Sequence, residues 1–253
     1  MDVRMDGRVA AITGASTGLG LAMAKEFAAS GASVALLARK ADALASAKAE
    51  VAKAAGKTNA KIEAYSCDVS KAQPIADTFK KIEAEFGKVD ILVNNAGISH
   101  AKAFETVTDE DWQGDLDLKL FAAIRTIRAV LPGMRQRKWG RILAITSISA
   151  REPQPGLVIS NSLRAGLLGL INSVSRDVAR DGITINALLP GYTATERLTE
   201  LGVDDATIGP KIPAGRIGRP EEFAALAAFL ASERASYITG QAIAVDGGFL
   251  NSI

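Results

Sequence analysis

The chain has 253 residues, of which 48% are apolar and 23% charged, and its formal net charge is +2 at pH 7. This composition predicts one globular domain, gives no indication of a nucleic-acid or membrane partner, and includes no apolar run long enough to cross a bilayer. One cysteine, Cys67, and one histidine, His100, exclude an internal disulfide and a His/Cys metal cluster, so we expect a cytoplasmic protein with no metal.

Short apolar runs alternate with longer helical patterns along the whole chain. Seven runs have the length and composition of strands: 8–13, 33–37, 61–66, 90–93, 140–146, 184–189 and 242–245. Six helical patterns lie between them: 18–30, 41–55, 71–86, 109–137, 157–180 and 221–231. Because a crossover between parallel strands needs a helix, the alternation predicts an α/β fold with a doubly wound parallel sheet and helices on both faces.

The segment from Thr13 to Gly20 follows the first predicted strand and opens the first predicted helix. Its glycines, Gly14, Gly18 and Gly20, can adopt backbone angles that other residues avoid, and they leave the main chain open to a ligand. Free N–H groups at a helix start bind phosphate, helped by the helix dipole. In this strand-turn-helix context the segment predicts a site for the pyrophosphate of a dinucleotide.

The end of the second predicted strand indicates which dinucleotide is bound. An acid near this position usually holds the ribose 2′-hydroxyl of NAD, whereas a cation accommodates the 2′-phosphate of NADP. The chain has Ala38-Arg39-Lys40 here, with no acid. The guanidinium of Arg39 suits a phosphate, so NADP(H) is favoured over NAD(H).

Further motifs accompany the glycine turn: Asn94-Asn95-Ala96-Gly97 after the fourth predicted strand, Pro190-Gly191 after the sixth, and 239–248 at the last. As a set they resemble the short-chain dehydrogenase/reductase family over essentially all 253 residues. The resemblance implies a single Rossmann-type domain over 1–253 and NAD(P)-dependent oxidoreductase activity, as in 3-oxoacyl thioester reductases. With Arg39, the implied cofactor-binding residues are Gly14, Ser16, Thr17, Gly18, Leu19, Gly20, Asp68, Val69, Asn95, Ala96, Gly97, Arg164, Pro190, Gly191 and Thr195.

The catalytic residues of that family match this chain in part. The family uses a Ser, a Tyr-x-x-x-Lys pair and an Asn on an earlier helix. Ser147 follows the fifth predicted strand, at the place expected for the Ser. Ser160 and Arg164 stand where the Tyr and the Lys are expected, and Lys119 stands at the Asn position. The resemblance thus implies an atypical catalytic set made of Ser147, Ser160, Arg164 and Lys119.

This set leaves the proton donor open. A phenol has a pKa near ~10 that a neighbouring cation can lower, whereas the aliphatic hydroxyl of Ser160 is a far weaker acid. Arg164 stays protonated at neutral pH, but it can contact ribose hydroxyls and stabilise negative charge. A desolvated Lys119 beside that guanidinium should have a lowered pKa, as a general acid needs. We rank Lys119 first as the donor, followed by His100 and Tyr192.

The segment 193–219, punctuated by glycine and proline, is predicted to form a lid over the substrate. The sequence therefore favours an NADP(H)-dependent oxidoreductase that acts on a small-molecule carbonyl or alcohol. The alternative is a catalytically degenerate protein that keeps the NADP(H) site as a sensor or scaffold.

Two surface features concern the binding of nucleic acid and the formation of oligomers. The basic stretch 135–141 lies at a predicted helix end, where cations complement the helix dipole, so we interpret it as a solvated terminus and expect no nucleic acid. The helical patterns at 109–137 and 157–180 have apolar faces that resemble the family's dimer surfaces. The resemblance therefore implies a homo-oligomer, either a dimer or a tetramer.

Overall fold

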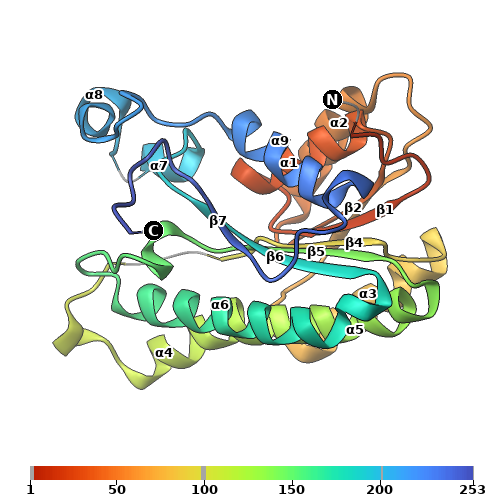
Figure 1. Ribbon diagram of the computed structural model, residues 1–253, viewed down its shortest axis with the longest axis horizontal. Coiled ribbons are helices and arrows are strands. Elements are labelled where there is room, and N and C mark those ends of the chain that lie inside the picture. Colours follow the sequence, from red (N-terminus) through yellow and green to blue (C-terminus); the bar gives the residue numbers. More distant parts are fainter. Residues whose placement is uncertain (1–2, 98–100, 201, 253) are drawn as a thin grey trace.

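A parallel sheet of seven strands forms the middle layer of the computed structural model, which describes residues 3–97, 101–200 and 202–252 (Figure 1). Its strands are β1 (Val9–Thr13), β2 (Ser33–Ala38), β3 (Ile62–Ser66), β4 (Ile91–Asn94), β5 (Gly140–Ile145), β6 (Ile183–Pro190) and β7 (Ala242–Val245). They lie in the order β3-β2-β1-β4-β5-β6-β7, and neighbouring strands pair in parallel. The order reverses between β1 and β4, so the loops that follow these two strands diverge and leave a crevice at the carboxyl edge of the sheet.

Helices cover both faces of this sheet (Figure 1). One face carries α1 (Gly18–Ala29), α2 (Ala41–Ala55) and α9 (Pro220–Ala231), and the other carries α3 (Ala72–Phe86), α5 (Ala122–Arg137) and α6 (Val158–Val178). The short helices are η1 (Phe104–Thr106), α4 (Asp109–Asp115), η2 (Leu116–Phe121), η3 (Ile148–Ala150), η4 (Ala179–Asp181), α7 (Glu196–Glu200), α8 (Asp205–Ile208), η5 (Gly209–Lys211) and η6 (Glu233–Ala235). None of the helices in the described ranges is both long and apolar enough to span a bilayer.

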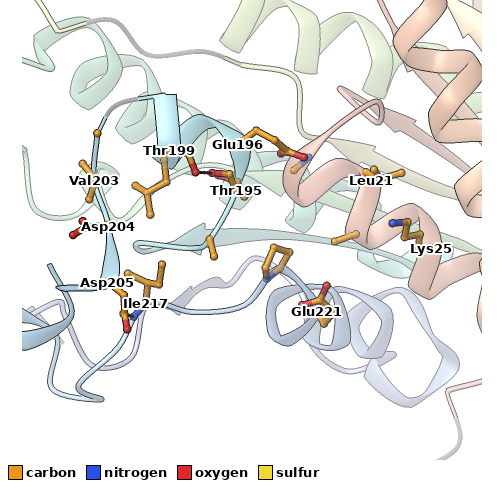
Figure 2. Close-up of a pocket in the computed structure, with 16 residues that line it drawn as sticks. Leu21, Lys25, Thr195, Glu196, Thr199, Val203, Asp204, Asp205, Ile217 and Glu221 are labelled. Carbon is orange, nitrogen blue, oxygen red and sulfur yellow. Dashed lines mark hydrogen bonds between the residues drawn. The ribbon is translucent and has the colours of Figure 1, made fainter. Parts of the chain in front are cut away.

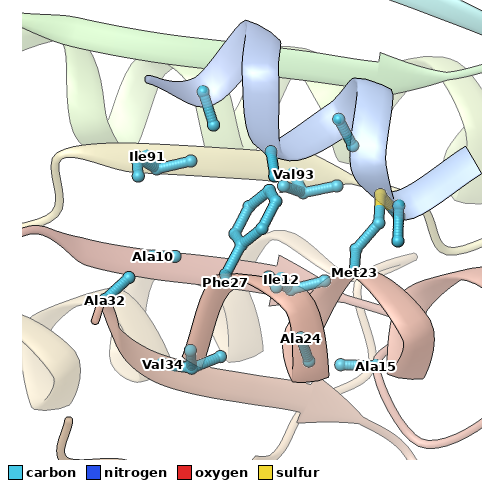
Figure 3. Packing of buried hydrophobic residues seen from close by; sticks show 14 of the residues in the cluster. Ala10, Ile12, Ala15, Met23, Ala24, Phe27, Ala32, Val34, Ile91 and Val93 are labelled. Carbon is cyan, nitrogen blue, oxygen red and sulfur yellow. The ribbon is translucent and has the colours of Figure 1, made fainter. Parts of the chain in front are cut away.

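The core explains why β1 is apolar from Val9 to Ile12. Alternate side chains of a strand point to opposite faces of its sheet. Ala10 and Ile12 therefore pack with Met23 and Phe27 of α1, whereas Ala11 belongs to the core on the other face (Figure 3). Both faces of β1 are covered, so a continuous apolar run is required there. The predicted α/β fold, with its doubly wound parallel sheet, is confirmed.

One predicted element differs from the structure. The apolar pattern at 109–137 predicts a single helix, but the chain forms α4, then a π-helical segment, η2, and then α5. A π turn closes its hydrogen bonds one residue further along than an α turn, and it occurs mostly as a single turn inside an α-helical stretch. The sequence pattern therefore shows the helical stretch but not the π turn within it.

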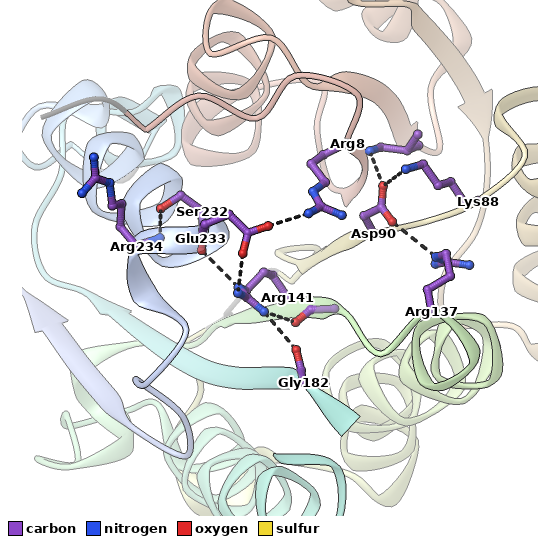
Figure 4. A network of polar contacts seen from close by, with 11 residues as sticks. Arg8, Lys88, Asp90, Arg137, Arg141, Gly182, Ser232, Glu233 and Arg234 are labelled. Carbon is purple, nitrogen blue, oxygen red and sulfur yellow. Dashed lines mark hydrogen bonds and ion pairs between the residues drawn. The ribbon is translucent and has the colours of Figure 1, made fainter. Parts of the chain in front are cut away.

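A polar network connects several elements at the opposite edge of the sheet, the amino edge, where the parallel strands begin (Figure 4). Arg141 at the start of β5 has a side chain only 2% exposed, and it donates hydrogen bonds to the carbonyls of Gly140 (2.9 Å), Gly182 (3.2 Å) and Ser232 (3.1 Å). Its guanidinium also lies 3.7 Å from the carboxylate of Glu233. These contacts join β5 to the turn before β6 and to the end of α9. They lie at the amino edge and do not involve the carboxyl edge of the sheet.

Candidate active site

The glycine turn after β1 is packed so closely that only glycine fits at two of its positions. A methyl group on Gly20 would lie 2.1 Å from the carbonyl oxygen of Gly14, and one on Gly14 would lie 2.9 Å from Nδ2 of Asn95. That Nδ2 donates hydrogen bonds to the carbonyls of Thr13 (3.1 Å) and Gly14 (3.0 Å). The hydroxyl of Thr13 accepts hydrogen bonds from the main-chain N–H groups of Asn95 (2.9 Å) and Ala96 (3.1 Å). The amide of Asn95 therefore holds the turn in shape and ties it to the end of β4.

The amino end of α1 meets the segment that was predicted to be a lid. Thr17, which precedes the helix, is extended, and its side chain makes no capping hydrogen bond. The main-chain N–H of Gly18 donates a hydrogen bond to the carboxylate of Glu196 in α7 (3.1 Å). The side chain of Thr195 also reaches this point, 3.5 Å from where a methyl group on Gly18 would lie. The other predicted residues of the turn are half-buried: Ser16 and Leu19.

The ends of β2 and β3 place a cation and an anion side by side. Arg39 is exposed, and its carbonyl accepts a hydrogen bond from the hydroxyl of Ser66 (3.0 Å). The carboxylate of Asp68 accepts hydrogen bonds from the hydroxyl (2.7 Å) and the N–H (3.1 Å) of Ser70. These hydrogen bonds, with smaller contributions from the charges of Lys71 and then Arg39, lower the pKa of Asp68. Val69 is buried beside them.

The loop after β6 is packed against the segment that follows β7. Pro190 ends β6, and a methyl group on Gly191 would lie 2.7 Å from the backbone of Asp246. Tyr192 contacts Phe249 edge to face, with the ring centroids 5.2 Å apart. The ring of Tyr192, which ranked third as a proton donor, therefore packs against another aromatic side chain.

Three of the predicted catalytic residues lie where β5 ends against α6. The guanidinium of Arg164 donates hydrogen bonds to the hydroxyl of Ser160 (3.1 Å), one turn earlier in α6, and to the carbonyl of Thr146. Ser147 follows Thr146 directly, and its hydroxyl accepts a hydrogen bond from the N–H of Ser149 (3.1 Å). Arg164 therefore connects Ser160 to the main chain beside Ser147.

The fourth residue, Lys119, reaches the same place from the π-helical segment η2. Its side chain is 3% exposed and forms an ion pair with Asp115 at the end of α4. A methyl group on Gly97, after β4, would lie 3.8 Å from Cγ of Lys119 and 3.7 Å from Nη2 of Arg164. Lys119 and Arg164 therefore flank the main chain of Gly97.

Burial and neighbouring charges change the pKa values of Lys119 and Arg164. Burial, the largest effect, lowers the pKa of Lys119, and the charge of Arg164 lowers it further, while the ion pair with Asp115 opposes both. Burial also lowers the pKa of Arg164, to about 10, again opposed by Asp115. At neutral pH Arg164 keeps its charge, so a negative group that forms beside Gly97 would face a fixed cation.

Two residues at the site were not predicted from the sequence. Asp115 precedes Lys119 by four residues, a spacing that pairs side chains on a helix and that could have been recognised as an ion pair. Glu196 meets Gly18 across 178 residues of sequence, and no local pattern reports such a contact. His100, the second candidate for the proton donor, lies outside the described residues.

A cavity of about 720 Å³ opens between α1, α7 and the start of α9 (Figure 2). Gly18 and Lys25 line it from α1, Glu196 from α7, and Ile217 and Glu221 from the approach to α9 and its first turn. The cavity therefore begins at the glycine turn and lies under the segment 193–219. The fold and the turn together define a Rossmann-type α/β protein.

Comparison with known proteins identifies the family. A family model described as Enoyl-(Acyl carrier protein) reductase matches residues 14–250. The acetoacetyl-CoA reductase of Rhizobium meliloti (strain 1021) is 40% identical over 243 residues, which cover 95% of this chain and 98% of that protein. The 3-oxoacyl-[acyl-carrier-protein] reductase FabG of Escherichia coli (strain K12) is 37% identical over 247 residues, which cover 97% and 98%.

Solved structures agree with these sequence matches. L-Sorbose reductase from Gluconobacter frateurii, complexed with NADPH and L-sorbose, is 34% identical, with a TM-score of 0.94 and 100% of both chains covered. YwfH, an NADPH-dependent reductase involved in bacilysin biosynthesis, is also 34% identical, with a TM-score of 0.91 and 97% and 99% of the chains covered. The chain belongs to the short-chain dehydrogenase/reductase family.

Proposed function

We propose that the protein is an NADP(H)-dependent oxidoreductase that reduces a carbonyl group, with a 3-oxoacyl thioester as the first substrate class to test. The observation that carries the proposal is the convergence of Lys119 and Arg164 on Gly97, at the carboxyl edge that also holds the glycine turn. The substrate class is taken from the acetoacetyl-CoA and 3-oxoacyl reductases that the chain resembles.

The residues at the carboxyl edge fit a dinucleotide. The turn at Gly14 and Gly20 leaves no room for side chains, and Thr17 makes no side-chain capping hydrogen bond at the amino end of α1, where a diphosphate would bind. Exposed Arg39 would hold the 2′-phosphate of NADP(H). Thr195, beside Gly18, would contact the nicotinamide half. When bound, the cofactor supplies a hydride to the carbonyl carbon.

Side chains of the protein would then bind and protonate the carbonyl oxygen of the substrate. Ser147 and Ser160 would hold the carbonyl oxygen by hydrogen bonds, and Arg164 would stabilise the negative charge that develops on it. Lys119 would donate the proton, because its burial lowers its pKa toward the range of an effective general acid. Ser160 is too weak an acid to replace a phenol in this role.

The segment 193–219 completes the proposed site as a lid. It includes α7, α8 and η5, and its residues Thr195 and Glu196 already contact the glycine turn. A lid at this place would cover the nicotinamide half and exclude water from the reacting atoms.

The activity is tested with purified protein, NADPH or NADH, and a panel of 3-oxoacyl thioesters and other carbonyl compounds. We expect oxidation of NADPH, followed by its absorbance, to be faster than oxidation of NADH. Lys119→Ala should lower the rate by about 10²–10⁴-fold, the usual contribution of a general acid. Lys80→Ala, which removes an exposed lysine of α3, is the matched control and should keep the wild-type rate. Full activity of Lys119→Ala would overturn the assignment of the donor.

A catalytically degenerate NADP(H)-binding sensor or scaffold is the second candidate function. It is favoured by the aliphatic hydroxyl of Ser160, which accepts a hydrogen bond from Arg164 at the position where the family's phenol is expected. Tight binding of NADPH, with no oxidation by any compound of the panel, would support this candidate. Steady oxidation of NADPH would exclude it.

A further inference from the structure

Asp115 occupies a particular place beside the proposed proton donor. It is the last residue of α4, and the π-helical segment η2 begins directly after it. Its carboxylate forms the ion pair with Lys119, four residues later. The side chain of Lys119 is 3% exposed, whereas that of Asp115 is 18% exposed, so the carboxylate is the more exposed partner of the pair.

The surroundings of Lys119 make this carboxylate important for the charge of the amine. A buried ammonium needs a partner of opposite charge, because burial strongly disfavours an unpaired ion. Among the described residues, two charged groups act on Lys119: Asp115 from α4 and Arg164 from α6. Arg164 opposes the ammonium form and Asp115 favours it. The carboxylate therefore offsets both the burial and the neighbouring guanidinium.

A small cavity lies beside Asp115. The cavity has a volume of about 40 Å³, and its lining includes Asp115, Lys102, Asp111, Gly156 and Val158. This volume is enough for a water molecule, which needs about 10–15 Å³, and polar groups are present to hold it. Water in this cavity would be a source of protons beside Asp115.

We propose that Asp115 is a positioning residue that holds Lys119 as an ammonium ion and passes it a proton from the small cavity after each reduction. The inference rests on the proposed reductase function. In the forward step one N–H bond of Lys119 breaks and an O–H bond forms on the substrate oxygen, as the carbonyl carbon receives the hydride. The neutral amine then regains one proton from water through the carboxylate, so each reduced carbonyl consumes one proton from solvent.

The first test measures the titration of Lys119 directly. Protein with ¹⁵N-labelled lysine side chains is titrated by NMR, and the signal of Lys119 is assigned by its absence from Lys119→Ala. Removal of an opposite charge at ion-pair distance shifts a titration by about 1–3 pH units, so Asp115→Asn should lower the midpoint of Lys119 by that amount. Asp115→Glu, which keeps the charge, should restore most of the shift. Asp115→Ser provides a second neutral variant if Asp115→Asn does not fold.

Asp117→Asn is the matched control. Asp117 lies two residues further along in η2, and its carboxylate pairs with Arg125 instead of Lys119 (2.9 Å). The control therefore removes the same charge from the same helical stretch and should leave the titration of Lys119 unchanged. An equal shift in Asp117→Asn and Asp115→Asn would overturn the inference.

The second test follows the reduction rate as a function of pH. The donor must be protonated, so the rate should fall as pH rises through the pKa of Lys119, and in Asp115→Asn that fall should begin at a lower pH. An unshifted lysine titration in Asp115→Asn would refute the role of Asp115, whatever the activity. Absence of NADPH oxidation by the wild-type protein would instead refute the proposed function. The two failures are therefore distinguishable.

Discussion

Single residues at the glycine turn show how closely the backbone is packed where the cofactor is proposed to bind. The methyl group of an alanine at position 20 would lie 2.1 Å from the carbonyl oxygen of Gly14. That oxygen belongs to the main chain and accepts a hydrogen bond from Asn95, so it cannot move aside without disturbing the end of β4. The turn therefore tolerates no side chain at Gly20, even though this residue lies inside a helix.

Gly20→Ala is accordingly expected to lower the free energy of unfolding by about 1–3 kcal/mol, the usual cost of an overpacked site, and to weaken NADPH binding. Chemical denaturation and a fluorescence titration with NADPH measure the two effects. Gly166→Ala is the control, because a methyl group at this helical glycine of α6 meets nothing within 4 Å. Similar stability and affinity in both variants would contradict the close packing at Gly20.

At the scale of elements, the amino ends of α1 and α7 meet through a charged contact between their first residues. The carboxylate of Glu196 accepts a hydrogen bond from the N–H of Gly18, the first residue of α1. A diphosphate bound at the same end would bring negative charge close to this carboxylate. The segment that carries α7 must therefore shift, or tolerate repulsion, when the cofactor binds.

Glu196→Gln should bind NADPH more tightly, by about two- to fivefold, because the repulsion is removed while the side chain keeps its size. Equilibrium titration with NADPH measures the change. Glu221→Gln is the control, since Glu221 lines the same cavity from the first turn of α9 and lacks the contact with Gly18. Weaker binding by Glu196→Gln than by the wild type would show that the carboxylate assists the cofactor.

The helices and strands also show which parts of the structure could be predicted from the sequence. The β1 run could be recognised as a buried strand because both of its faces are covered, which requires apolar residues at consecutive positions. The π turn in η2 could not be predicted, because the apolar residues on both sides of it keep a helical period. The contact between Glu196 and Gly18 joins elements that the chain separates by many residues, and only the tertiary fold brings them together.

At the scale of the whole molecule, the amino edge and the carboxyl edge of the sheet carry different groups of residues. The amino edge is tied together by Arg141, whose side chain is 2% exposed and donates to three main-chain carbonyls (Figure 4). The carboxyl edge holds the glycine turn, the cluster at Gly97 and the cavity under 193–219. The buried polar network and the proposed site therefore lie at opposite ends of the parallel strands.

Arg141→Met should lower the free energy of unfolding by about 1–3 kcal/mol, because buried carbonyls would lose their hydrogen-bond donor. The affinity for NADPH should remain that of the wild type, since Arg141 lies at the far edge. Denaturation curves and a cofactor titration measure the two quantities. Arg135→Met removes a half-exposed partner of Asp181 and should change stability by less than about 0.5 kcal/mol. Equal losses in both variants would contradict the role of the buried network.

The π turn has a consequence for how this helical stretch tolerates changes in length. One residue of a regular α-helix turns the side chains that follow by about 100°, and a π turn holds one residue more than an α turn. Deletion of a residue within 116–118 would thus allow a regular helix but would redirect Lys119 away from Gly97. The position of the Lys119 side chain beside Gly97 therefore depends on the number of residues in this segment as well as on their type, so we expect insertions and deletions here to alter the proposed chemistry.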